Sequence, residues 1–264
     1  MPLALSTLGL PDLPLAAAAR LAADHGWHGL ELRCAPGQPV HPGLTADERR
    51  AATRALASTG TVPLALASYV GIAAPGADAP LLADLGGHLE LAADLGCPAV
   101  RVFPHGGAAP GPAAADERAD ERAARRLAAV AGRAAALGVR VLVETHDSHP
   151  TGRDLARLLA PVVHPAVGAL WDLQHTVLGG EPPQATHRAL VGRLGHVQVK
   201  DVASAADRTP LPLGAGTLPI AACLALLPAD AWVCWEYEAP WYPEAAPLAP
   251  LLGAAAAWLA GLRR

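Results

Sequence analysis

Short apolar runs alternate along the chain with longer segments in which apolar residues recur every three or four positions. The short runs are rich in Val, Leu and Ala and are flanked by Gly or Pro, which is typical of buried strands. The longer segments carry one apolar face, which is typical of helices that pack on a sheet. The pattern therefore predicts strands that alternate with helices along the whole chain.

The predicted elements follow one another with little room for other structure. Strands are predicted over residues 3–8, 28–32, 62–68, 99–103, 139–147, 169–171, 196–199 and 232–235. Helices are predicted over 14–25, 45–58, 79–95, 115–137, 153–159, 184–194 and 219–227, with a last helix that ends at 261. Asp12 and Thr45 are candidate N-caps, and Gly96 is expected to end the third helix.

Regular alternation of strand and helix indicates a parallel sheet. Eight such units in 264 residues predict the α/β class and a single (β/α)8 TIM barrel that spans residues 1–264 as one domain. No Gly-x-Gly-x-x-Gly motif follows a strand, which argues against a doubly wound dinucleotide-binding sheet. Because the strands of such a barrel run in parallel, the C-terminal ends of the last four strands should meet at one mouth.

Oxygen-bearing side chains stand at the ends of those four strands, namely Glu144, Asp172, Gln198 and Glu236, with Glu238 as the alternative on the eighth strand. Carboxylate and amide oxygens are hard donors that suit Mn²⁺ or Mg²⁺ better than zinc. Crowded carboxylates without a cation would repel one another and raise their pKa values. A rim ion pair with arginine could explain one of them, but four on consecutive strands favour a divalent-metal site.

Six further residues near the strand ends are candidates for substrate binding. His175 follows Asp172 by three residues, and His146 follows the fifth-strand glutamate by two, so both are expected to face the mouth. Lys200 is the only lysine beside nineteen arginines, and it is expected either to bind a substrate group or to pair with Asp201. The remaining candidates are Arg101, His105 and Trp171. Glu31 is a candidate proton relay or, as the favoured alternative, the partner of Arg33 in a salt bridge at the rim.

Composition and charge exclude some function classes. The formal charge of −4, without a long basic run, gives no reason to expect nucleic acid as a partner. No basic leader precedes an apolar segment and no apolar stretch is long enough to span a bilayer, so we expect a cytoplasmic protein without a membrane partner. The four cysteines are far apart and are expected to be reduced core residues. A homodimer is left open.

Several segments together resemble the sugar phosphate isomerase/epimerase superfamily of xylose-isomerase-like TIM barrels, which also contains endonuclease IV. The most specific are Glu-Thr-His at 144–146, Trp-Asp-x-x-His at 171–175 and His-Val-x-Val-Lys-Asp at 196–201. Weaker matches are Gly-Leu-Glu-Leu-Arg at 29–33, Val-Arg-Val-Phe at 100–103, Leu-Gly-Ala-Gly at 213–216 and Trp-Glu-Tyr-Glu at 235–238. Together they span nearly the whole chain in the order found in that superfamily.

The resemblance implies metal ligands at Glu144, Asp172, Gln198 and Glu236. Most relatives carry histidine at the third of these positions, although the hydroxypyruvate isomerase branch looks similar in having glutamine. Glutamine keeps an oxygen donor, so Mn²⁺ or Mg²⁺ stays favoured, with Zn²⁺ or Co²⁺ as alternatives. Relatives also tend to carry an acidic residue where Ala215 stands, so any role of that side chain is missing here.

The resemblance implies an isomerase or epimerase that acts on a small-molecule sugar or sugar phosphate. A divalent ion bound to the substrate carbonyl and its neighbouring hydroxyl acidifies the carbon between them and stabilises the enediolate. Glu144 and Glu236 are expected on opposite sides of the sugar, one to take the proton and one to return it. Return to the neighbouring carbon gives an aldose–ketose or hydroxypyruvate-like isomerase, and return to the opposite face gives a ketose epimerase.

Three other functions stay open. A cyclic polyol (inosose-type) dehydratase would use nearly the same groups to expel a hydroxyl after proton abstraction. An endonuclease IV-like hydrolase would need a three-zinc site with extra histidines, whereas this chain has Ser68 near one such position and no Asp-x-His after the seventh strand. A non-catalytic binding protein on a retired barrel is disfavoured by the four retained oxygen donors.

Overall fold

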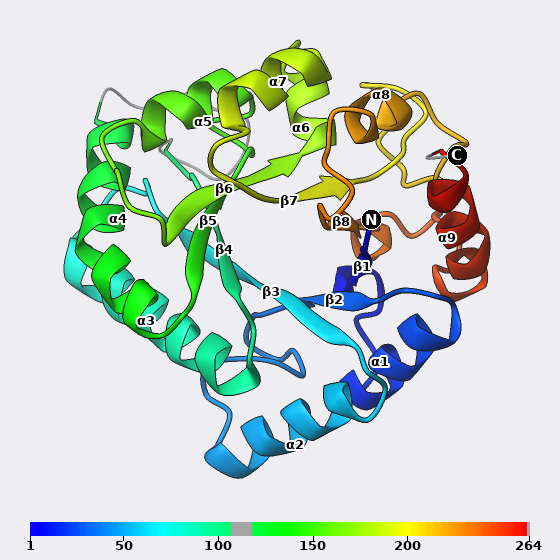
Figure 1. Cartoon of the computed structure of the whole chain (residues 1–264), viewed down its shortest axis with the longest axis horizontal. Coiled ribbons are helices and arrows are strands. Elements are labelled where there is room, and N and C mark those ends of the chain that lie inside the picture. Colours follow the sequence, from blue (N-terminus) through cyan, green and yellow to red (C-terminus); the bar gives the residue numbers. More distant parts are fainter. Residues whose placement is uncertain (107–117, 263–264) are drawn as a thin grey trace.

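The predicted alternation of strands and helices forms a closed barrel in the computed structural model, which describes residues 1–106 and 118–262. Eight parallel strands follow one another in chain order, and helices surround them (Figure 1). The strands are β1 Leu3–Ser6, β2 Gly29–Arg33, β3 Val62–Gly71, β4 Ala99–Phe103, β5 Arg140–Glu144, β6 Val167–Asp172, β7 Leu194–Val199 and β8 Val233–Trp235. This arrangement confirms the (β/α)8 TIM barrel.

The helices lie outside the barrel; all but α9, which follows β8, stand between successive strands in the chain (Figure 1). They are α1 Leu15–Asp24, α2 Ala46–Ala57, α3 Asp78–Leu95, α4 Ala119–Ala136, α5 Gly152–Leu159, α6 Leu173–Leu178, α7 Pro183–Leu190, α8 Ile220–Leu224 and α9 Leu252–Gly261. Three short 3₁₀ helices are η1 Thr7–Gly9, η2 Ala239–Trp241 and η3 Ala249–Leu251. The predicted start of the fourth helix, at residue 115, lies outside the described residues.

Strand side chains alternate between the layer under the helices and the barrel interior, because successive residues of a strand point to opposite faces. On β6, Ala169 and Trp171 belong to the large apolar cluster under the helices, whereas Leu170 packs in a small interior cluster. The same alternation directs Asp172, the next residue on the interior side, into the barrel mouth. On this strand, the polar side chain at the barrel mouth therefore follows directly on the apolar interior layer.

Local capping chemistry sets several helix ends. Thr45 caps α2 in a capping box with Glu48, as expected, and Gly96 ends α3 in the left-handed conformation at φ 68°. Asp12 does not cap α1, contrary to expectation: the N-cap position is Pro14, without a side-chain hydrogen bond. Short α6 was not predicted at all, and it begins because the Asp172 carboxylate accepts the backbone N–H of His175 at 3.2 Å.

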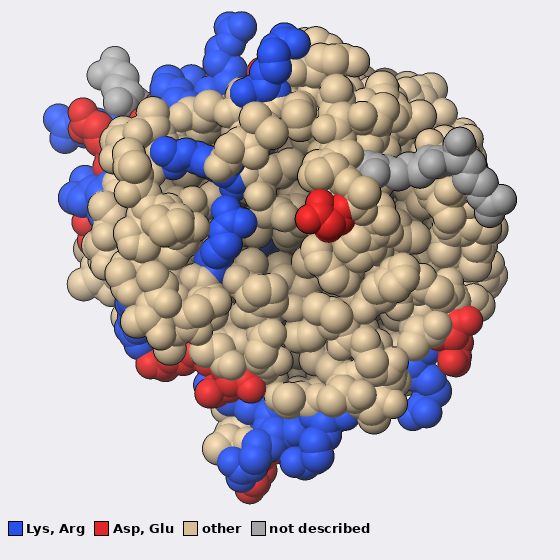
Figure 2. Space-filling model, in the orientation of Figure 1, with Lys and Arg blue, Asp and Glu red and all other residues tan. Residues whose placement is uncertain are grey.

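The cysteines lie in the core, as expected. Cys34, Cys97, Cys223 and Cys234 are buried and unpaired, and burial raises the pKa of the Cys34 and Cys97 thiols to about 12. On the face shown in Figure 2, basic side chains lie in several groups, with uncharged and acidic surface between them. Within the described part of the chain, no helix combines the length and apolarity needed to cross a membrane.

A fully buried arginine holds the connection between β3 and α3. The Arg126 guanidinium donates hydrogen bonds to the backbone carbonyls of Ile72, Ala74 and Gly76 at 2.9, 2.7 and 2.8 Å. It also donates to Asp78 Oδ1 at 2.7 Å. One side chain of α4 thus satisfies the carbonyls of a loop that has no regular structure of its own.

We expect Arg126→Met to lower the free energy of unfolding by about 3 kcal/mol, because it leaves the carbonyls of buried Ile72 and partly buried Ala74 without their donor. Arg125→Met is the matched control, since Arg125 binds the same Asp78 carboxylate from an exposed position and contacts none of these carbonyls. Urea unfolding followed by circular dichroism measures both variants. Equal losses would mean that the ion pair with Asp78, and not the carbonyl contacts, stabilises the connection.

Candidate metal centre

Three carboxylates meet at the C-terminal ends of β5, β6 and β8. Strand register places Gln198 opposite Asp172, and Glu236 directly follows β8. One oxygen from each of Glu144, Asp172 and Glu236 lies within 4.8 Å of the other two. Burial is the main reason why the pKa of Glu144 is raised well above its ordinary value, and burial likewise raises the pKa of Glu236.

Gln198 completes this group with an amide whose orientation is defined. Its Nε2 donates to Glu31 Oε1 at 2.8 Å and lies 3.4 Å from Glu236 Oε1. Its Oε1 is buried and accepts no hydrogen bond within the described residues, and the same holds for Glu144 Oε2 and Asp172 Oδ2. Arg101 Nε lies 3.2 Å from Glu144 Oε2 and Lys200 Nζ lies 2.9 Å from Asp172 Oδ2, so these two oxygens have a cation nearby, whereas Gln198 Oε1 has no donor within the described residues. An all-oxygen group of this kind fits a divalent cation.

Lys200 supplies positive charge beside the group. Its ammonium lies 2.9 Å from Asp172 Oδ2 and 2.5 Å from Glu238 Oε1, and it also contacts Glu236 Oε2. Burial alone would lower the pKa of Lys200, but these three carboxylates raise it well above its ordinary value, so the ammonium stays charged. The expected alternative, a pair with Asp201, is wrong, because that carboxylate accepts backbone N–H groups of the following loop.

The two glutamates after β8 occupy different places. Glu236 belongs to the converging carboxylates, whereas Glu238 contacts Lys200 and lies outside that set. The Glu238 side chain is also more exposed, at 19% against 7% for Glu236. Of the two, Glu236 is therefore the better candidate for the eighth-strand ligand.

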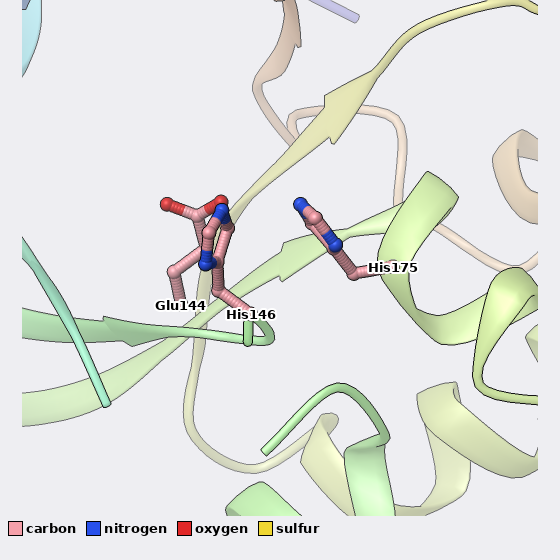
Figure 3. Close-up of side chains that lie close together, drawn as sticks. All are labelled: Glu144, His146 and His175. Carbon is pink, nitrogen blue, oxygen red and sulfur yellow. The ribbon is translucent and has the colours of Figure 1, made fainter. Parts of the chain in front are cut away.

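Two histidines face the Glu144 carboxylate. Figure 3 shows Glu144 and His146 at the end of β5, with His175 of α6 across from them. One ring nitrogen of each lies within 4.8 Å of a Glu144 oxygen, and the two ring centroids are 4.2 Å apart. Burial lowers the pKa of His175 well below its ordinary value, and its Nε2 has no hydrogen-bond partner among the described residues. A neutral imidazole nitrogen is thus available to a ligand.

Asp147 orients the histidines at the edge of the group. Its Oδ2 lies 3.0 Å from His146 Nδ1 and 3.3 Å from His105 Nε2. Burial alone would raise the pKa of Asp147, but the hydrogen bonds from His146 and from the Ser148 N–H lower it to about 2. His105, at φ 50°, stacks on Phe103 with ring centroids 5.0 Å apart. A carboxylate that binds one ring nitrogen of an imidazole fixes the ring, and the other ring nitrogen then points away from that carboxylate.

Arg101 lies against the carboxylates from β4. Its Nε is 3.2 Å from Glu144 Oε2, and its guanidinium carbon is 3.9 Å from the centre of the Phe103 ring. Although Arg101 is only 3% exposed, its Nε and Nη1 form no hydrogen bond within the described residues. A buried guanidinium with N–H groups to spare can donate to a substrate oxygen.

Trp171 is the one substrate-binding candidate that the structure does not bring to this group. Its side chain lies in the apolar layer under the helices, and its indole N–H donates to Thr176 Oγ1 at 3.0 Å. Sequence reasoning also misplaced Glu31, which does not pair with Arg33. Instead Glu31 is fully buried inside the barrel, 2.9 Å from His196 Nε2. Apolar Leu30 and Leu32 on either side of it were the available signal that it faces inward.

Solved structures of similar fold include several enzymes. The probable 3-DHS dehydratase AsbF from Bacillus anthracis shares 18% identity at a TM-score of 0.80, over 98% of this chain and 99% of its own. The 3-keto-D-glucoside 4-epimerase YcjR from E. coli shares 19% at 0.76, over 100% and 99%. The IolI protein, solved with a bound zinc atom, shares 16% at 0.80, over 99% and 98%. At such identities these likenesses show a common fold.

Sequence comparison gives the family assignment. No curated protein matches this chain. The family model described as xylose isomerase-like TIM barrel matches residues 19–262, which is most of the chain. This match confirms the resemblance that the Glu-Thr-His and Trp-Asp-x-x-His segments indicate. The chain belongs to the xylose isomerase-like TIM barrel family.

Proposed function

We propose that this protein is a divalent-metal-dependent isomerase or epimerase that moves a proton at the carbon next to a carbonyl in a small sugar. The observation that carries the proposal is the convergence of the buried oxygens of Glu144, Asp172 and Glu236 beside Gln198, whose Oε1 is buried and accepts no hydrogen bond within the described residues. These four side chains would hold the ion. Their oxygens favour Mn²⁺ or Mg²⁺, and the nearby nitrogens of His146 and His175 keep Zn²⁺ or Co²⁺ as alternatives.

A bound divalent ion would stabilise the negative charge that develops on a substrate oxygen when the carbon loses its proton. The protein itself has to take that proton and return it, and Glu144 and Glu236 are the candidates. A bound cation would keep both carboxylates ionised at neutral pH, as a general base requires. The two have different neighbours, Arg101 beside Glu144 and Lys200 beside Glu236, so they are suited to different steps.

Substrate contacts are proposed on the side where polar atoms lack partners. Arg101 and His175 offer buried nitrogen atoms without hydrogen bonds, and His105 and Lys200 stand beside the same mouth. The Phe103 ring, between Arg101 and His146, limits access of water to this space. The keto-glucoside epimerase of similar fold supports a sugar as the substrate.

A dehydratase is the second candidate, and Lys200 is the observation that favours it. The first step is the same removal of a proton from carbon by a carboxylate. The carbon–oxygen bond of a neighbouring hydroxyl then breaks, and the hydroxyl leaves as water with the proton that the carboxylate took from carbon. The Lys200 ammonium, which the surrounding carboxylates keep charged, can donate a hydrogen bond to that hydroxyl oxygen as it departs.

Proton exchange separates these functions. The metal-loaded protein is incubated in D₂O with ketoses, aldoses and hydroxypyruvate, and deuterium incorporation is followed by NMR. We expect metal-dependent exchange at the carbon next to the carbonyl, lowered about 100-fold or more in Glu236→Gln. Glu238→Gln is the matched control, because Glu238 shares Lys200 but lies outside the converging carboxylates, and we expect a much smaller loss.

The same NMR spectra distinguish the isomerase from the dehydratase. An unsaturated product without recovered deuterated sugar would indicate the dehydratase. A complete absence of exchange and product, with Mn²⁺ demonstrably bound, would contradict the isomerase proposal. Equal losses in Glu236→Gln and Glu238→Gln would contradict the assignment of Glu236 as the proton-transfer residue.

Metal affinity should rise with pH. Because the pKa values of Glu144 and Glu236 are raised, the metal-free protein holds protons at pH values where an ordinary glutamate is ionised. Metal binding must displace them, so the Kd for Mn²⁺ should fall as pH rises from about 5 to about 8. By the same linkage, the metal-free fold loses stability as pH rises through this window, because the unfolded chain binds fewer protons. Calorimetric titrations in buffers of different ionisation enthalpy count the released protons, and a Kd independent of pH would contradict the expectation.

Removing the Lys200 charge should make the fold depend on metal. Lys200→Met leaves buried carboxylates without their cation, and we expect the metal-free protein to lose about 3–5 kcal/mol of stability. Mn²⁺ should then raise the melting temperature of this variant more than that of the wild type, because the ion replaces the missing positive charge. Arg33→Met, which removes a cation that contacts Tyr69 and no carboxylate of the group, is the control. Equal Mn²⁺ shifts in all three proteins would show that Lys200 and the ion do not act on the same carboxylates.

A further inference from the structure

The proposed metal centre depends on which end of the Gln198 amide faces the ion. An amide presents an oxygen acceptor on one side and an NH₂ donor on the other, and only the oxygen can bind a cation. The two orientations have nearly the same shape, so packing alone does not select one of them. Some neighbouring group has to hold the NH₂ away from the metal.

Two carboxylates occupy the NH₂ side of Gln198. Glu31 Oε1 accepts from Nε2 at 2.8 Å, and Glu236 Oε1 lies farther away, at 3.4 Å. Glu236 is itself a proposed metal ligand, so its oxygens are shared with the ion. The short hydrogen bond to Glu31 is therefore the one that defines the amide orientation and leaves Oε1, which is buried and without a donor, for the cation.

Glu31 reaches Gln198 across the barrel. Glu31 belongs to β2 and Gln198 to β7, and β1 and β8 lie between these strands in the sheet. The second Glu31 oxygen accepts from His196 Nε2 at 2.9 Å, two residues before Gln198 on the same face of β7. Both Glu31 oxygens are thus engaged by β7, and the side chain is fully buried.

We propose that Glu31 is the positioning residue of the metal centre, which fixes the Gln198 amide with its oxygen toward the ion and so sets metal affinity. This inference rests on the metal centre proposed above. Glu31 itself lies behind Gln198 and donates no ligand atom to the carboxylate group. Its effect on the metal passes through one hydrogen bond.

The test measures Mn²⁺ binding by metal-stripped protein, with free Mn²⁺ quantified by electron paramagnetic resonance. Glu31→Leu removes both acceptors at similar volume, and we expect a Kd about 10–100-fold weaker, the usual effect of losing such a hydrogen bond to a ligand. His196→Gln is the matched control, because it changes the other partner of Glu31 and leaves the bond to Gln198. Its Kd should stay within about threefold of the wild-type value.

A swapped pair distinguishes positioning from general support of the fold. In Glu31→Gln combined with Gln198→Glu, the amide donates from β2 and the carboxylate on β7 binds the metal, at unchanged net charge. We expect this double variant to bind Mn²⁺ within about tenfold of wild type and more tightly than the separate effects of Glu31→Gln and Gln198→Glu would give when added, a non-additive result. Melting temperatures of all variants confirm that folded proteins are compared. If Glu31→Leu does not fold, the double variant against its two single variants decides.

The outcomes separate the two proposals. Wild-type affinity in Glu31→Leu, or a swapped pair no tighter than the added effects of its two single substitutions, would overturn the positioning role while the metal centre stands. Equal weakening in Glu31→Leu and His196→Gln would do the same, because it would reveal general support of the barrel interior. Failure of the wild-type protein to bind Mn²⁺ would overturn the metal centre itself, and the role of Glu31 with it.

Discussion

Carboxylates buried at the end of a barrel have to meet positive charge or donor groups, because an uncompensated buried charge costs several kcal/mol. The mouth of this barrel satisfies that constraint group by group. Glu31 accepts a hydrogen bond from His196, and Glu144 lies beside Arg101. The three remaining carboxylates, those of Asp172, Glu236 and Glu238, surround the Lys200 ammonium. Arg101 lies on β4 and Lys200 directly follows β7, so the mouth of the barrel is organised by charge as much as by packing.

Much of this arrangement could be predicted because it depends on local rules. The alternation of apolar runs defines the strands, and a closed parallel barrel brings the ends of consecutive strands together, which is why Asp172 and Gln198 meet. The partner of Glu31 follows no such rule. His196 is 165 positions away and lies across the barrel, so only the diameter and tilt of the assembled strands decide that the two side chains touch.

The direction in which strand side chains face explains why the prediction for Trp171 differs from the structure. Trp171 stands at a strand end, but Leu170 and Asp172 on either side of it face inward, so the indole must face the helices. Helix α6 escaped prediction because it is short, and a six-residue helix carries too little periodicity to show an apolar face. For Trp171, the direction of the indole follows from the inward-facing residues on either side of it. For α6, the start of the helix follows from Asp172, the residue directly before it.

Asp172 performs two tasks with one carboxylate. One oxygen accepts the backbone N–H that begins α6, and the other faces the cluster of carboxylates. A cation bound at the proposed centre would pull on this side chain and, through the hydrogen bond to His175, on the first turn of α6. Glutamate at position 172 would keep the charge but would shift the carboxylate, and with it the helix start and the His175 imidazole.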